Sequence, residues 1–202
     1  MRIASLVVTL AFFGCEEPRE EGPAPSRFAA AKRSSDTAAE RAAKSFCEVT
    51  FPRGETGRTL AAPPERPVPG TAAPTPTTNG RWRWVNLWAT WCRPCVEEMG
   101  LLTKWRDSLG KDGVAIDMEM WSVDDDEAAL VEFLKSHTLP GQVRWLRSSQ
   151  DMPAFLEALG ADKASPIPVH ALVDDSAHVR CVRVGSVHDE DYAAVKALLA
   201  GG

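Results

Sequence analysis

Two cysteines separated by two residues are the part of this 202-residue chain whose types and spacing best suit chemistry. Cys92-Arg93-Pro94-Cys95 follows a short apolar run and precedes a stretch with helical periodicity, so we expect Cys92 at the start of a helix. Free amides and the helix dipole at such a position favour an anion, and the thiolate is the reactive form of cysteine. The spacing therefore predicts thiol–disulfide exchange, in which Cys92 attacks and Cys95 resolves the mixed disulfide.

Three other uses of the cysteine pair stay open at this point. A structural zinc site needs two more ligands, whereas the other cysteines are single and the four histidines are scattered. The pair can also form a permanent structural disulfide within one helical turn, or handle copper. We expect no bound metal and no cofactor.

The residues around the pair indicate an α/β fold. Residues 84–89 form a short apolar run that suits a strand buried on both faces, and apolar residues recur every three or four positions up to Gly110. Further strands are expected over residues 114–123, 143–146, 169–173 and 179–184, and further helices over residues 127–134, 152–159 and 192–199. This order predicts a central mixed sheet, parallel in its first half and ending in an antiparallel hairpin, with helices on both faces.

Acidic residues precede two of the expected helices. Asp124 with Glu127 is interpreted as a capping pair, and Asp151 as the cap of the following helix. Helix capping and solvation explain the acidic run 124–126 more simply than a metal site does.

The N-terminal residues have the pattern of an export signal. Arg2 precedes about eleven mostly apolar residues, which suits a secretory signal and is too short to span a bilayer. Gly14-Cys15 and the acidic residues after it resemble the cleavage box of bacterial lipoproteins, which implies acylation of Cys15. An ordinary signal peptide and a buried N-terminal element are the alternatives. We assign residues 1–14 to the signal peptide and residues 15–45 to the lipid anchor and a flexible tether.

Residues 46–202 are assigned to the folded domain. It begins with a β-like patch over residues 46–51, an N-terminal extension of the sheet, and Thr59-Leu60 can pair back on that patch. Six prolines within residues 61–80 exclude a helix or a central strand there, so this insertion is expected to be a surface loop. The net charge of −5 argues against nucleic acid as a partner, because binding phosphates needs a clustered basic surface.

The stretch VNLWATWCRPC at positions 85–95 resembles the active-site signature of TlpA/ResA-type bacterial thiol–disulfide oxidoreductases of the thioredoxin superfamily. The resemblance extends from about residue 46 to residue 199. It implies a thioredoxin-like fold on the periplasmic side of a bacterial membrane and reduction of disulfides in extracytoplasmic proteins, often apocytochrome c. Electrons would come from a membrane thiol donor. An oxidase or isomerase of secreted proteins, and a non-enzymatic copper-handling or partner-binding module, are the alternative functions.

The same resemblance assigns residues to substrate binding. Trp91 would shield the thiol at the surface. Within residues 165–174, Pro168 matches a proline with a cis peptide bond that faces the two cysteines, and Ile167 would offer backbone hydrogen bonds to the substrate. His170 either faces the active site or packs in the core, and we expect it to pack.

Glu98 matches an acidic residue that several reducing relatives carry just after the cysteine pair. It would tune the thiols or shuttle a proton as a catalytic residue, and the alternative is a solvated glutamate, as expected for Glu97. Gly100 stands where relatives carry a kinking proline, which leaves the position of Glu98 relative to the thiols open.

Cys47 and Cys181 remain after the anchor and the redox pair are assigned. Disulfides persist outside the cytoplasm, and the early β-like patch can run beside the last strand. A structural Cys47–Cys181 disulfide is therefore our hypothesis, and two separate buried thiols are the alternative.

Overall fold

A central sheet organises the protein, whose computed structural model describes residues 38–51, 58–73 and 81–201. In these residues the sheet has six strands in the order β1-β6-β5-β2-β3-β4. The strands are β1 (Val49–Thr50), β2 (Trp82–Trp88), β3 (Ile116–Ser122), β4 (Gln142–Trp145), β5 (Val169–Val173) and β6 (Val179–Val184). β2, β3 and β4 are parallel, whereas β5 is antiparallel to both β2 and β6, and β1 is antiparallel to β6. The mixed sheet expected from the sequence is confirmed.

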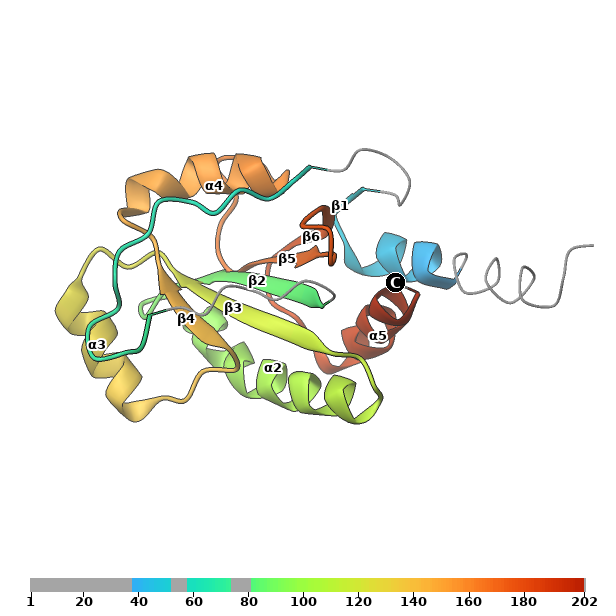
Figure 1. Cartoon of the computed structure of the whole chain (residues 1–202), viewed down its shortest axis with the longest axis horizontal. Coiled ribbons are helices and arrows are strands. Elements are labelled where there is room, and N and C mark those ends of the chain that lie inside the picture. Colours follow the sequence, from blue (N-terminus) through green and yellow to red (C-terminus); the bar gives the residue numbers. More distant parts are fainter. Residues whose placement is uncertain (1–37, 52–57, 74–80, 202) are drawn as a thin grey trace, which may run out of the picture.

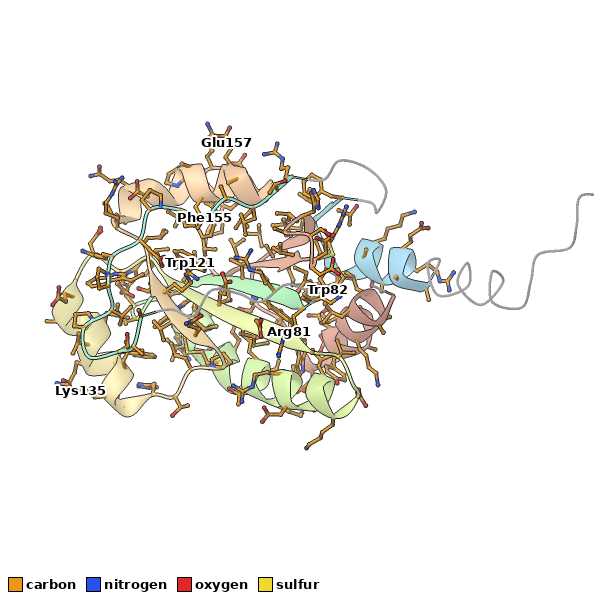
Figure 2. The ribbon with its side chains drawn as sticks, in the orientation of Figure 1. Arg81, Trp82, Trp121, Lys135, Phe155 and Glu157 are labelled. Atoms are coloured by element: carbon orange, nitrogen blue, oxygen red, sulfur yellow. A yellow bond between two sulfur atoms is a disulfide. The ribbon has the colours of Figure 1, made fainter. Side chains whose placement is uncertain are left out.

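Helices cover both sides of this sheet. They are α2 (Arg93–Lys111), α3 (Glu127–Ser136), α4 (Met152–Leu159) and α5 (Tyr192–Ala200). Figure 1 shows α2 and α5 on one side of the sheet and α4 on the other. Phe155 points from α4 toward Trp121 on the sheet, with ring centroids 5.2 Å apart, and Glu157 points away from it (Figure 2).

Helix α2 forms because its apolar positions recur at helical spacing. Its buried residues are Cys95, Glu98, Met99, Leu102, Trp105 and Leu109. Trp105 lies against Trp84 of β2, with ring centroids 6.0 Å apart, and both indoles are almost fully buried. Burial of side chains this large contributes several kcal/mol and holds the first turn of α2 at a fixed place over the sheet.

The folded region extends further toward the N-terminus than the sequence indicated. Residues 38–46, which we had largely assigned to the tether, are helical, with Ala42 and Phe46 buried. The guanidinium of Arg183 lies over the Phe46 ring and donates to the Phe46 carbonyl at 3.2 Å. A narrow apolar face suffices here because two side chains dock on a surface that is already formed.

The described part of the proline-rich segment follows the open edge of the sheet. Arg66 stacks on the Trp145 ring at 3.4 Å and donates a hydrogen bond to the Asp124 carbonyl at 2.8 Å. Glu65 pairs with Arg144 at 2.7 Å and bridges to Leu146. This segment covers the edge strand β4, which otherwise exposes unpaired backbone groups. Thr59 pairs with His178 in the β5–β6 turn, and not with the 46–51 patch.

Two capping expectations were wrong in detail. The N-cap of α3 is Asp126, which accepts from the Ala129 amide at 3.1 Å, because the Asp124 carboxylate instead accepts from Thr90 in the loop before Cys92. Asp151 is the N-cap residue of α4, as expected, but its carboxylate pairs with Arg147 at 2.9 Å and makes no cap hydrogen bond.

Cys15, the expected signal peptide and most of the expected tether lie outside the described residues. Among the helices that the structure does describe, none combines the length and the apolar character that crossing a membrane requires.

Candidate functional site

Cys92 and Cys95 form a disulfide where β2 passes into α2. The S–S distance is 1.99 Å and the Cα atoms are 5.3 Å apart. Cys92 is the N-cap residue of α2 in extended conformation, and Pro94 enters the first turn, where a missing N–H costs nothing. Trp91 lies next to the pair, and 70% of its surface is exposed. It is the exposed residue among the large hydrophobic residues that the structure describes. The side chains of both cysteines are largely buried, Cys95 more so than Cys92.

The loop before β5 faces this disulfide. The Ile167–Pro168 peptide bond is cis, and the Ile167 carbonyl oxygen lies 3.7 Å from Cys92 Sγ. The Pro168 carbonyl accepts from the Gly185 amide at 2.8 Å, which ties the loop to the end of β6. The structure thus brings Trp91 and Cys92 together with Ile167 and Pro168. More than seventy residues separate the first two residues from the last two in the chain.

Asp124 holds the loop that leads into the cysteine pair. Its carboxylate accepts from the Thr90 amide at 3.1 and 3.2 Å, from the Thr90 hydroxyl at 2.7 Å and from the Ser122 hydroxyl at 2.8 Å. Its carbonyl accepts from Trp145 Nε1 at 2.7 Å. A buried carboxylate with this many donors is well satisfied, so it fixes the backbone two residues before Cys92.

Glu98 is buried behind the disulfide, one helical turn beyond Cys95, and only 5% of its surface is exposed. One carboxylate oxygen accepts from the Val187 amide at 3.0 Å, and the other accepts from Asn86 Nδ2 at 3.3 Å. His170 Nε2 lies 3.2 Å from that second oxygen. The alternative of a solvated glutamate applies instead to Glu97, which is exposed.

His170 is buried, as expected, but it belongs to a polar cluster and not to an apolar core. It faces Asn86 across the β2–β5 pairing. Its Nδ1 lies 3.1 Å from Trp84 Nε1 and 3.1 Å from Asn86 Nδ2. Sequence reasoning did not single out Asn86, although a lone amide inside the apolar run 84–89 is the kind of signal that marks a buried polar contact.

The charges at the mouth of the site are largely paired. Arg93 and Glu97 form an exposed ion pair with a nitrogen–oxygen distance of 2.7 Å. The hydrogen bond and the charge of Glu97 raise the pKa of Arg93 above its usual value, so this arginine stays cationic beside Cys92.

Cys47 and Cys181 form a second disulfide at the far end of the sheet. The S–S distance is 1.99 Å, the Cα atoms are 5.4 Å apart, and the two residues are 134 positions apart in the chain. The bond joins β6 to the segment just before β1, and β1 is the strand that pairs with β6. In the parts of the chain that the structure describes, no three histidine, cysteine or acidic side chains come together as metal ligands would.

Comparisons with known proteins agree with this geometry. No family model matches the chain. The chain is 26% identical over 113 residues to the thiol-disulfide oxidoreductase ResA of Geobacillus kaustophilus, covering 56% of this chain and 60% of the relative. It is also 26% identical over 101 residues to ResA of Bacillus cereus, covering 50% of this chain and 53% of the relative. The chain thus spans little more than half the length of these curated relatives.

Two solved structures share the fold. A thioredoxin-related protein from Neisseria meningitidis serogroup B has a TM-score of 0.54 at 22% identity, covering 66% of this chain and 96% of that protein. A thiol:disulfide interchange protein from Bacteroides sp. has a TM-score of 0.55 at 18% identity, covering 73% of this chain and 92% of that protein. The thioredoxin-like fold is confirmed, and part of the chain is similar in sequence to ResA-type thiol-disulfide oxidoreductases.

Proposed function

We propose that this protein is a thiol–disulfide oxidoreductase that reduces disulfides of extracytoplasmic proteins through the Cys92–Cys95 pair. The observation that carries the proposal is the Cys92–Cys95 disulfide at the N-terminus of α2, facing the Ile167 carbonyl and flanked by an exposed tryptophan. A redox-active pair must be able to close by one bond, and its attacking sulfur must be the more accessible of the two. The bond is closed here, and Cys92 is 5% exposed against 1% for Cys95.

The proposed reaction begins with the reduced protein. The Cys92 thiolate attacks one sulfur of the substrate disulfide, a Cys92–substrate bond forms, and the other substrate sulfur leaves and takes up a proton. Cys95 then attacks Cys92, the Cys92–Cys95 bond forms, and the second substrate thiol is released. Counting the proton that Cys92 released when it became a thiolate, the substrate disulfide gains two electrons and two protons, and the protein dithiol loses the same number.

Position within α2 supports this order of attack. Cys92 is at the N-cap, where the free amides and dipole of α2 stabilise a thiolate. Cys95 lies inside the first turn and is almost fully buried, so a large substrate reaches Cys92 first.

We assign proton transfer at Cys95 to Glu98. The two residues are three positions apart on the buried face of α2, a spacing that makes side chains neighbours on a helix. The Glu98 carboxylate would accept the Cys95 proton during resolution, which frees the thiolate that attacks Cys92.

Substrate binding is assigned to the surface around the disulfide. The exposed Trp91 indole offers a flat apolar contact, and the Ile167 backbone lies close enough to Cys92 to bond a substrate strand during attack. Apocytochrome c is one candidate substrate, and a membrane thiol protein is the proposed electron donor, both from the resemblance to ResA-type proteins.

Location follows from the N-terminal sequence. A signal peptide over residues 1–14, a lipid on Cys15 and a tether would hold the domain on the periplasmic side of a bacterial membrane. Metabolic labelling with a radioactive fatty acid tests this, with Cys15→Ser as the control that should lose the label.

Reduction of insulin disulfides with dithiothreitol as electron source tests the activity. Wild-type protein should accelerate the reaction, and Cys92→Ala should abolish the acceleration. Glu98→Gln should change the pH dependence, whereas Glu132→Gln, at an exposed glutamate of α3, should not. Acceleration that survives Cys92→Ala would refute the mechanism, and equal effects of the two glutamate variants would remove Glu98 from it.

A further inference from the structure

A buried polar cluster connects α2 to the two central strands of the sheet. Glu98 comes from α2, His170 from β5, and Trp84 and Asn86 from β2. Trp84 and His170 are each 1% exposed, and Glu98 is 5% exposed. Burying this many polar groups costs free energy unless they satisfy one another, so their mutual arrangement is meaningful.

The partners of His170 determine which of its nitrogens carries the proton. The indole N–H of Trp84 can only donate, and it lies 3.1 Å from His170 Nδ1. Nδ1 must therefore be an acceptor, which leaves the proton of the neutral ring on Nε2. An imidazolium would place two N–H groups against each other, so Trp84 holds His170 in the neutral Nε2–H form.

That Nε2–H group faces the Glu98 carboxylate. Nε2 and the nearer carboxylate oxygen are 3.2 Å apart, although the ring N–H is not aligned well enough to count as a hydrogen bond. Nε2 has no other hydrogen-bond acceptor among the described residues. If a buried donor loses the one acceptor within its reach, the protein loses stability. The positions of His170 and Glu98 therefore depend on each other.

We propose that His170 is a positioning residue that holds the Glu98 carboxylate where it can accept the Cys95 proton, with its own tautomer set by Trp84. This inference rests on the proposed function, because it deepens the role given to Glu98 as the acceptor of the Cys95 proton. Without the imidazole, the carboxylate oxygen that faces Nε2 loses this neighbour and is held by Asn86 alone. Glu98 is then less well placed to accept the proton of Cys95, and resolution of the mixed disulfide slows.

Few other ionisable groups face His170. α2 contributes Glu98, and β2 contributes the uncharged Trp84 and Asn86. On β6, Arg183 lies directly opposite His170, and it is 3.4 Å from Asp191, which lies just before α5. Arg183 is therefore paired with Asp191, and it also donates to the Ser186 carbonyl. Glu98 is thus the carboxylate that the imidazole contacts.

Two substitutions of His170 separate the imidazole donor from simple space filling. His170→Gln keeps an N–H donor near the position of Nε2, and His170→Leu removes it at similar volume. In insulin reduction, kcat should fall about tenfold in His170→Leu while KM stays near the wild-type value, which corresponds to about 1.4 kcal/mol. His170→Gln and the exposed control His137→Leu should keep the wild-type kcat.

A second measurement does not depend on turnover. Nitrogen-15 NMR of the histidine rings in the wild-type protein should show His170 with Nε2 protonated and Nδ1 unprotonated from pH 5 to 8, the signal being assigned by its absence in His170→Gln. A charged ring or the Nδ1–H form would overturn the inference, as would equal kcat values in an active wild type and His170→Leu. Lack of insulin reduction by the wild type would instead overturn the proposed function itself.

Discussion

Removing the Cys47–Cys181 disulfide should destabilise this protein strongly. The bond closes a loop across 134 positions of sequence, so in the chain-entropy description it removes about 5 kcal/mol of conformational freedom from the unfolded state. Measured values usually fall below that limit, and we expect the double variant Cys47→Ala/Cys181→Ala to lose about 3–5 kcal/mol. For a domain of this size that corresponds to a fall in Tm of about 8–16 °C.

The matched control opens the other disulfide. Cys92→Ala/Cys95→Ala also removes two sulfur atoms, but its bond spans a separation of only three, for which the same description gives about 1.5 kcal/mol. Urea unfolding of both variants and the wild type under oxidising conditions, followed by circular dichroism, measures the difference. Equal losses in the two double variants would refute the reasoning, because loop length would then not set the stabilisation.

Three further substitutions test local features of the structure. Gly100→Ala should raise the free energy of unfolding by about 1 kcal/mol, because a Cβ there meets no atom within 4 Å inside α2, and urea unfolding that shows a loss would contradict this. Asp124→Asn should lower it by about 1–3 kcal/mol and slow insulin reduction, since Asn cannot accept from both Thr90 donors and Ser122, and an unchanged Tm would count against the loop-holding role. Burial opposes ionisation of Asp174, but hydrogen bonds from the His178 amide, Arg180 and the Ser176 amide outweigh it and lower its pKa. The stability from Asp174 is thus present above the usual carboxyl pKa of about 4 and lost as pH falls through the lowered value, so the Tm difference from Asp174→Asn should shrink in acid, and a constant difference would contradict it.

Local patterns were enough to predict much of the fold. The apolar run 84–89, the helical spacing after it and the hairpin turn 174–178 are each set by neighbouring residues, and all three are present. The helix over residues 38–46 was missed because its stability depends on docking Ala42 and Phe46, which no local pattern reveals.

The site shows the same division between local and distant contacts. The spacing of Cys92 and Cys95 is a local feature, whereas the Glu98–His170 contact exists only because α2 packs over paired strands β2 and β5. Asp124 looked like a helix cap because its neighbour Asp126 has that role. Its contact with Thr90 joins the ends of two parallel strands and depends on their register.

The equilibrium reduction potential of the Cys92–Cys95 pair decides whether this protein reduces its partners. The wild-type chain can be equilibrated with dithiothreitol or glutathione buffers, and the fraction of the two cysteines that is alkylated can be read by mass spectrometry of their peptide. A reductase should have a potential near or below about −250 mV. A value near −120 mV would mark an oxidant, and a pair that stays oxidised at every accessible potential would be a structural disulfide. Either result would contradict the proposed function.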